Sequence, residues 1–548
     1  MRHYHFDGIL AARHNKQHLQ HRFMVPAGCA ALEVDFRFAP AGAQGLSHLI
    51  TLTLFDPAGF RGAGHRDGAA HRVHIAAEDA TPGYLAGPLP AGEWIVQLDT
   101  HRIVPGEPVR YGLDVVLPAA IAGENTSPPA PPLRGEGSTS PPTPPLRGEG
   151  STSPPTPPLR GEGSTSPPAP PLRGEGSTSP PAPPLRGEGS VSPPSLPGKG
   201  AGGLGETRVG GLGEKGAGGL GETRAGGLGE RKAAASRGPG WYRGDLHTHT
   251  VHSDAEGLSV ADLLAMARRV GLDFVFLTDH NTTAGHAEMD TAAASDLLPA
   301  AGLELTTFWG HAVCLGTRHW VDWRIHPGTG EMARIAQEIY AEGQVFIIAH
   351  PQSPGDPCCT GCAWRFGDMM PGHARLVEIW NGPWAGDSGN EAALALWYDW
   401  LNQGYRLVAT AGSDTHAATD YDRRPGFNVV YAGALDEAAL LKALLAGHLY
   451  LSAGPRVNLE ARDAGGEARM MGDTVAGPAE FTLTWADCPT DARIRVIANG
   501  MLMAGLSAAP GAGAYTWRMT PDDADWVLVE IRNPDGQMLA ITNPIFIG

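Results

Sequence analysis

Apolar and polar positions alternate along the first part of the chain. The segment LEVDFRF (32–38) alternates strictly, and parts of 49–55, 94–98 and 109–116 do the same, with Asp-Pro and Pro-Gly turns between them. Alternation of this kind is typical of strands that bury one face. We therefore predict a β-sandwich-like accessory domain over residues 1–122, in which no cluster of catalytic residue types is found.

The pattern then gives way to two short repeats. The first resembles PPLRGEGSTSPPT and repeats every 13 residues, with Arg134, Arg147, Arg160, Arg173 and Arg186 at equivalent positions. The second resembles GLGETRAG and repeats every 8, with Leu204, Leu212, Leu220 and Leu228 at equivalent positions. Neither unit has enough apolar surface to offset the entropy of ordering it. Residues 123–239 are predicted to be a disordered, Pro/Gly-rich linker; its PxxP-like pieces leave binding of a partner open, and a spacer role is favoured.

Between residues 240 and 455, short apolar strands alternate with helical patterns. DFVFLTDH and VFIIAHP read as strands, whereas VADLLAMARRVG, EMARIAQEIYAEG, EAALALWYDWLNQG and DEAALLKALLAG have the period of amphipathic helices. Repeated strand–helix alternation predicts parallel strands with crossover helices, and hence an α/β barrel or a related sheet. Residues 456–548 return to strand patterning, as in FTLTW, RIRVIA and WVLVEIR, and are predicted to form a C-terminal β domain.

Charge and apolar content restrict the possible partners. The formal net charge is -17, and the repeats are close to neutral, so the excess negative charge lies on the remaining segments. Such a surface disfavours tight binding of long nucleic acid, although metal ions would still permit a small phosphorylated substrate or a short oligonucleotide. No signal-peptide core and no 18-residue apolar run are present, so we predict a cytoplasmic protein without membrane association.

Six cysteines in 548 residues do not make a disulfide scaffold. Three of them, Cys358, Cys359 and Cys362, fall in the single segment PCCTGC. Half a zinc site, a redox pair and a structural loop all fit this spacing, and the loop is favoured because no second pair is present.

Candidate chemistry is concentrated where apolar strands end. There the sequence places imidazoles and carboxylates, namely His247, His249, Asp254, His280, Glu304, His311, His350, Asp414 and His416. His247 and His249 lie two apart, so both would point to the same side of a strand. In α/β barrels the carboxyl ends of strands converge on the active site. So many buried ionisable groups would repel one another or remain unsatisfied unless metal ions organised them, which predicts a metal site.

These segments resemble the motifs of a known enzyme superfamily. GDLHTHTVHSD, LDFVFLTDHN, the Glu304 and His311 pair, AHP and AGSDTH are similar, in order, to those of the PHP (polymerase and histidinol phosphatase) superfamily. EIWNG and TNPIFIG resemble its CehA/McbA-type metallohydrolase branch. The resemblance covers residues 241–548. It implies a multidomain α/β protein whose central domain is a distorted (β/α)7 PHP barrel, flanked by the N-terminal β-sandwich and the C-terminal β domain.

The resemblance also implies how the ligands are shared. His247, His249, Glu304 and Asp414 would hold one ion, and Glu304 would bridge to a second ion held by His311 and His350. Asp254, His280 and His416 would hold a third. Two or three divalent ions are therefore expected, and Mn, Zn and Fe all suit mixed imidazole and carboxylate ligands. The catalytic group is expected to be a metal-activated water rather than a side chain.

The predicted function is hydrolysis of phosphoester or phosphodiester bonds, in small nucleotides or by 5′–3′ exonuclease-type trimming. Carbamate or amide hydrolysis, known in the same branch, and a non-catalytic binding role remain alternatives. Candidate substrate contacts are Asn281, Asn381, Arg423 and Arg424, although the arginines fit exposed loop charges equally well. Trp380 fits either the cleft or the core.

If the repeats are only a spacer, they are dispensable for chemistry. Limited proteolysis is expected to cut between residues 123 and 238 and to leave a compact fragment starting near Trp241. Loss of all activity in that fragment would show that the N-terminal domain shares the site.

Overall fold

The computed structural model of the chain describes residues 1–118, 237–292, 296–370 and 372–548. Almost all of the predicted linker, residues 123–239, lies outside the described residues. No helix in the described ranges combines the length and apolar character needed to cross a membrane.

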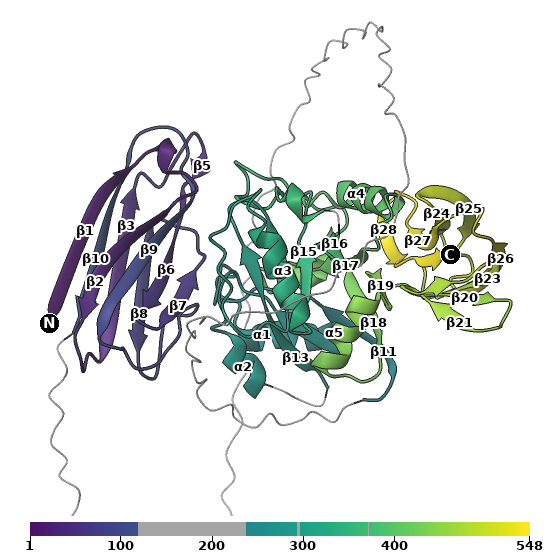
Figure 1. The fold of residues 1–548 in the computed structure, drawn as a ribbon, viewed down its shortest axis with the longest axis horizontal. Coiled ribbons are helices and arrows are strands. Elements are labelled where there is room, and N and C mark those ends of the chain that lie inside the picture. The colour runs from purple at the N-terminus through teal and green to yellow at the C-terminus, as the bar shows by residue number, and fades with distance from the viewer. Residues whose placement is uncertain (119–236, 293–295, 371) are drawn as a thin grey trace, which may run out of the picture. The chain divides into compact units, whose positions relative to one another are not determined.

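The N-terminal residues form two four-stranded antiparallel sheets (Figure 1). One has the order β1 (Arg2–Leu10), β10 (Val109–Leu117), β3 (Ala31–Ala39) and β8 (Ala70–Ala76). The other has the order β2 (His18–Val25), β9 (Gly92–Arg102), β6 (Leu49–Asp56) and β7 (Gly59–Gly64). A short helix, η1 (Ala12–His14), and the small strand pair β4 (Gly42–Ala43) and β5 (Leu46–Ser47) complete this part. The alternation of LEVDFRF buries Leu32, Val34 and Phe36 in one core with Trp94.

The central part is organised around a mixed sheet. Its strands are β11 (Gly240–Asp245), β12 (Phe274–Leu277), β13 (Leu298–Thr306), β14 (His311–Leu315), β15 (Val345–Ile348), β16 (Leu376–Asn381), β17 (Val408–Gly412), β18 (Phe427–Ala432) and β19 (Leu449–Ser452). The order is β17-β16-β15-β14-β13-β12-β11-β18-β19, and β14 runs antiparallel to both of its neighbours. β18 is likewise antiparallel to β11 and to β19.

Five α-helices lie between these strands: α1 (Val260–Arg269), α2 (His286–Thr291), α3 (Glu331–Ala341), α4 (Asn390–Asn402) and α5 (Glu437–Ala446). Short helices η2 (Gly367–Met369) and η3 (Asp420–Arg423) occupy two further connections. Local sequence explains the starts of α1 and α5. Ser259 accepts a hydrogen bond from the Asp262 amide, and Asp436 accepts one from the Ala439 amide, so each caps a first turn.

The predicted distorted (β/α)7 barrel is wrong. Among the described residues 43% lie in strands and 14% in helices, and the large sheet is mixed rather than parallel. The physical reason lies in the connections. β13 and β14 are joined by a tight turn, Thr307–Gly310, that forces them antiparallel. The connections after β15 and β17 lack the apolar 3.6-residue period of a crossover helix and form loops with η2 and η3.

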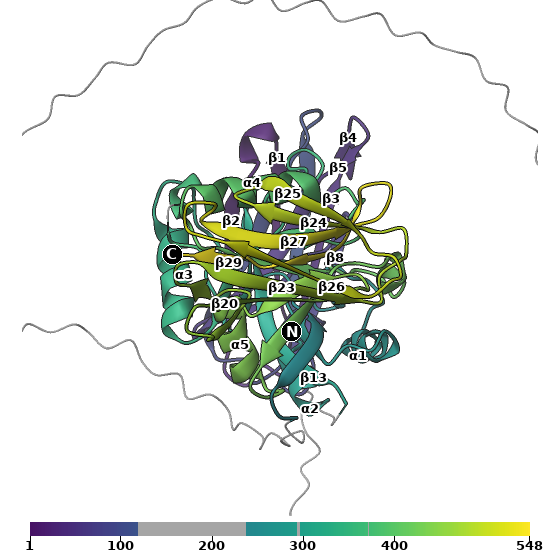
Figure 2. The same cartoon turned by 90° about the vertical axis from the view of Figure 1, so that its right-hand side faces the viewer.

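The C-terminal strands belong partly to the same sheet. Beyond β19 it continues through β28 (Met538–Thr542), β27 (Trp526–Arg532), β24 (Arg493–Ala498) and β25 (Met501–Ser507). Figure 2 shows β27, β24 and β25 side by side. A separate four-stranded sheet has the order β21 (Ala468–Met470), β20 (Arg456–Asp463), β23 (Ala479–Ala486) and β26 (Gly513–Met519). β22 (Thr474–Val475) pairs with β29 (Ile545–Ile547). Leu459, Phe481, Val496 and Val529 share the core between the two sheets.

Two buried asparagines satisfy the outer edge of β17, the strand that ends the sheet. Asn428 accepts from the Ala411 amide at 3.0 Å and donates to the Ala411 carbonyl at 2.7 Å. Asn543 does the same for Ala409, at 2.7 and 3.0 Å. Side chains thus replace the neighbouring strand that this edge lacks.

We expect Asn428→Ala and Asn543→Ala each to lower the free energy of unfolding by about 2–4 kcal/mol, because each leaves two buried backbone groups without partners. Urea unfolding followed by tryptophan fluorescence measures this loss. Asn458→Ala is the matched control, since Asn458 on β20 is only partly buried and bonds another side chain. An equal change in all three variants would contradict the role given to the asparagines.

Candidate metal centre

The nine predicted ligands lie at one edge of the central sheet. β11, β12, β13, β15, β16 and β17 run in the same direction, so their carboxyl ends meet there. His247, His350 and Asp414 stand two residues past the ends of β11, β15 and β17, and His280 stands three residues past the end of β12. β14 runs in the opposite direction and therefore begins at this edge, with His311 as its first residue.

Glu304 and Asp414 bring the two histidines of the first motif together. His247 Nε2 lies 3.5 Å from both Glu304 Oε2 and Asp414 Oδ1. His249 Nε2 lies 3.5 Å from Glu304 Oε2 and 3.0 Å from Asp414 Oδ1. Ligands about 2.1 Å from one ion are about 3.4 Å apart in tetrahedral and about 3.0 Å apart in octahedral geometry. The atoms of His247, His249 and Glu304 therefore have the spacing of ligands around one ion, whereas Asp414 belongs to a second such set, with His247 and His350.

The other carboxylate oxygen of Glu304 faces a second pair of imidazoles. Oε1 lies 3.0 Å from His311 Nδ1 and 3.2 Å from His350 Nε2. Since the two oxygens of Glu304 face different histidines, its carboxylate has the geometry of a bridge.

Asp254 gathers a third group. Its Oδ2 lies 3.3 Å from His280 Nε2, and its Oδ1 lies 3.1 Å from His416 Nε2. The ring of His249 stacks against those of His280 and His416, with centroids 4.3 and 4.5 Å away. Four overlapping sets of these residues have ligand atoms close enough to share an ion.

The residues present fit metal ions, because several ligand atoms have no other partner. These buried atoms form no hydrogen bond: His247 Nε2, His249 Nε2, Asp254 Oδ1, Glu304 Oε2 and His311 Nε2. A buried polar atom without a partner costs about 1–3 kcal/mol, and five in one place are not expected in a merely structural cluster. A divalent cation is the partner that imidazole nitrogens and carboxylate oxygens accept together.

Hydrogen bonds at Nδ1 orient three of the predicted ligand histidines. His247 Nδ1 donates to Glu378 Oε2 at 2.8 Å, His416 Nδ1 to the Asp414 carbonyl at 2.8 Å, and His350 Nδ1 to the Cys362 carbonyl at 3.3 Å. Each bond directs Nε2 at the cluster, where it can ligate once its proton has been displaced. The sequence analysis missed Glu378, whose only signal was a carboxylate within the apolar strand LVEIWN.

The four proposed substrate contacts are placed differently. Asn281 pairs both of its amide atoms with the backbone of Thr306, and Asn381 donates to Glu378 at 2.6 Å and to Asp414 at 3.2 Å. Asn281 therefore braces the end of β13, and Asn381 uses both of its amide hydrogens to hold Glu378 and Asp414. Arg423 and Arg424 are exposed at η3 and do not line the cavity beside the cluster. Trp380 is buried in the core against Trp384.

Backbone strain is concentrated at this edge. His350, Asp414 and Asn281 have positive φ values of 27°, 51° and 53°, which are uncommon for residues with a side chain. Strain of this kind persists where surrounding contacts impose it, and it is common at functional sites. Here it turns ligand-bearing residues inward at the ends of β15, β17 and β12.

The carboxylates and imidazoles determine one another's charge. Burial would raise the pKa of Glu304, but the imidazoles of His280, His247 and His311 hold it well below its usual value. Burial opposes protonation of His416, yet Asp254 raises its pKa to about 9. In the absence of metal, protons therefore occupy part of the site, and metal binding must displace them.

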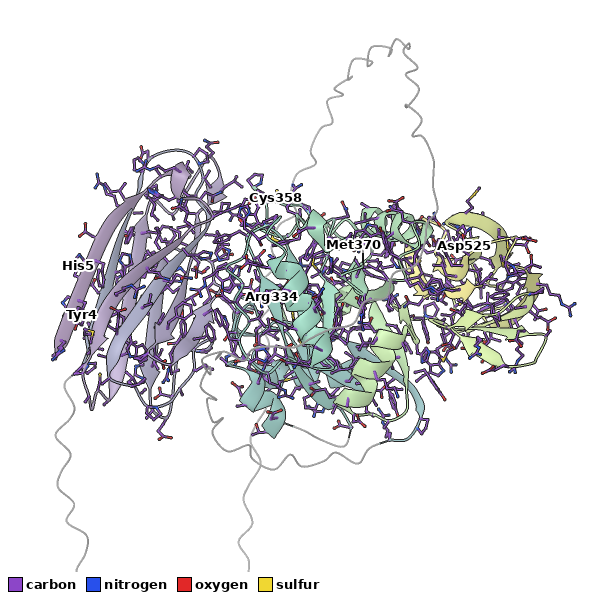
Figure 3. All side chains as sticks on the ribbon, in the orientation of Figure 1. Tyr4, His5, Arg334, Cys358, Met370 and Asp525 are labelled. Carbon is purple, nitrogen blue, oxygen red and sulfur yellow. A yellow bond between two sulfur atoms is a disulfide. The ribbon has the colours of Figure 1, made fainter. Side chains whose placement is uncertain are left out.

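A cavity of about 240 Å³ opens beside the cluster. Besides predicted ligands it is lined by Thr360 and the cysteine segment, in which Cys359 and Cys362 form a disulfide. Cys358, labelled in Figure 3, is exposed. A loop with a disulfide, rather than half a zinc site, is what the described residues show for PCCTGC. The N-terminal part also lines the cavity, through Leu49, His65, Asp67 and Arg102. The sequence analysis missed these residues, because no local pattern marks them.

His65 reaches the cluster directly. Its ring lies 4.6 Å, centroid to centroid, from that of His280. Burial, with His280 nearby, lowers the pKa of His65 to about 3, so its imidazole is neutral near pH 7. It belongs to none of the sets close enough to share an ion.

Comparison with known proteins adds no identification. Neither a protein-family model nor a curated protein sequence matches the chain. The assignment of the site therefore depends on its own geometry.

The contrast between Glu304 and Asp254 tests the multi-ion arrangement. Glu304→Gln should lower total metal content and cut turnover by more than about a hundredfold, because charge shared by two ions is lost. Asp254→Asn should deplete one ion and leave the others largely bound. Elemental analysis of both purified variants, with hydrolysis rates, separates these outcomes. Normal metal content and rate in Glu304→Gln would defeat the arrangement.

Proposed function

We propose that this protein is a hydrolase that uses two or three divalent metal ions and acts on phosphoester or phosphodiester bonds of small nucleotides or short oligonucleotides. The observation that carries the proposal is the convergence of nine imidazoles and carboxylates around ligand atoms that have no hydrogen-bond partner. The resemblance of the same residues to PHP motifs supports it. The cytoplasmic location predicted from the sequence is part of the proposal.

The protein's own residues supply positioning. Glu304 would hold two ions at a fixed separation, since its oxygens face different histidines. Glu378 fixes the orientation of His247 through Nδ1, and Asn381 holds Asp414 through Oδ2. Divalent ions bound here would activate a water molecule and clamp the oxygens of a transferring phosphoryl group.

The charge of the protein favours binding of an anionic substrate only next to the candidate metal centre. The chain has a net charge of -17, so attraction for a phosphate must come from the ions and from cations beside them. No serine or cysteine in the sequence stands in a recognisable nucleophile elbow or Cys–His signature. Chemistry through metal-activated water is therefore favoured over a covalent intermediate.

We expect chelation to abolish turnover and added Mn or Zn to restore it. The assay compares a phosphodiester, a phosphomonoester, a short oligonucleotide and an aryl carbamate on the same metal-loaded protein. Hydrolysis of a phosphorus ester at the highest kcat/KM supports the proposal, with the Glu304→Gln variant as the inactive control.

Other outcomes identify the alternatives. Preferential hydrolysis of the carbamate would assign a carbamate or amide hydrolase. A metal content near zero in the purified protein, with no turnover, would assign a binding role instead. Full activity in verified metal-free protein would overturn the proposal.

A further inference from the structure

The N-terminal β part was expected to be an accessory domain without a share in the chemistry. We propose instead that residues 1–118 form one wall of the substrate site, that His65 contacts the bound substrate, and that the cavity favours small phosphorylated molecules. The substrate class rests on the proposed function, whereas the assignment of residues 1–118 to the wall of the cavity does not depend on it.

The N-terminal residues bind each of four loops that carry predicted ligands. Lys16 donates to the Phe308 carbonyl at 2.7 Å, between Glu304 and His311, and pairs with Asp356 at 2.6 Å. Arg66 donates to the Val251 and Ser253 carbonyls, and Arg102 donates to the Pro357 and Cys358 carbonyls. The Gly83 carbonyl accepts a hydrogen bond from the Thr282 hydroxyl. Those loops follow His249, His280 and His350, so the wall touches the site on several sides.

The closest approach is at Gly83. Its φ of +90° and the 2.6 Å between an added Cβ and the His252 carbonyl leave room for glycine only. Its amide also donates to His252 Nδ1 at 3.1 Å. Backbone packed this closely is typical of a built interface, not of two surfaces that merely touch.

Aromatic packing holds His65 in place. Its ring meets that of His101 edge to face at 4.7 Å, and His101 stacks on Trp323 at 5.5 Å. Phe308, from the loop between two ligand strands, packs edge-on against His101 at 4.9 Å. His65 Nδ1 is shielded from solvent and has no hydrogen-bond partner. His65 also lines the cavity, and a residue so firmly backed is suited to bind a ligand there.

The cavity defines the class of that ligand. At about 240 Å³ it is smaller than the roughly 300–1,000 Å³ of ordinary ligand pockets, which favours a small molecule over an extended strand. Arg102 and His65 line it beside four of the predicted ligand histidines. An imidazole N–H and the part of the Arg102 guanidinium that is not bonded to Ser47, Pro357 and Cys358 suit phosphate oxygens. A small phosphomonoester fits this combination of size and charge better than an oligonucleotide.

The test uses the full-length, metal-loaded chain and two variants. Binding of inorganic phosphate is measured by calorimetry, metal content by elemental analysis, and kcat and KM with p-nitrophenyl phosphate. His65→Ala should keep the metal content of the wild type and weaken phosphate binding about tenfold, as expected for one lost hydrogen bond to a charged group. KM should rise more than kcat falls. His74→Ala, which changes a partly exposed histidine of β8 paired with Glu33, should leave all values within about twofold.

The outcomes separate the wall from the reaction. Phosphate binding that depends on His65, without hydrolysis of any ester, would contradict the proposed function but support the proposal that residues 1–118 line the binding site. Phosphate affinity unchanged in His65→Ala, or no phosphate binding by the wild type, would overturn the wall as a binding surface even if esters are hydrolysed. Equal kcat/KM for p-nitrophenyl phosphate and a 5′-phosphorylated dodecamer would overturn the restriction to small molecules.

Discussion

A buried carboxylate among imidazoles is the interaction on which the rest of the site depends. Glu304 lies within 3.5 Å of nitrogens from His247, His249, His280, His311 and His350. Removing a charge from water is costly, so this carboxylate stays ionised only because these residues surround it. The need to surround Glu304 with imidazoles also bears on the directions of the strands. β14 must turn back after four residues for His311 to reach Glu304, and that reversal makes the sheet mixed.

The sequence predicted the site more closely than the fold that carries it. Several of the predicted ligands, such as His280, His350 and Asp414, stand just after an apolar run, and this signal does not depend on the direction of the next strand. The prediction of a barrel was wrong because it did depend on strand direction. Whether two strands run parallel depends on the connection between them, and Thr307–Gly310 and the segments after His350 and Asp414 have no periodic pattern. Four of the five helices were predictable, because their apolar stripes and caps are local.

Residues that act through tertiary contact gave no such signal. Glu378 sits inside a buried strand, and its significance is visible only once His247, 131 positions earlier, lies beside it. His65 is further removed, since the predicted linker separates it from His280. A sequence read segment by segment assigns such residues to the part of the chain in which they stand. The geometry instead assigns them to the group that they contact.

The asparagine bridges at β17 have a consequence for the order in which the protein folds. Asn543 lies 134 positions after Ala409, the residue whose backbone it satisfies. Until those downstream residues are synthesised, the edge beside Asp414 exposes unpaired amides and carbonyls, which readily pair with another chain. Contacts so distant in sequence also form slowly. The central sheet therefore matures late, and the nascent chain is most exposed to misassembly while the residues of the candidate site already exist.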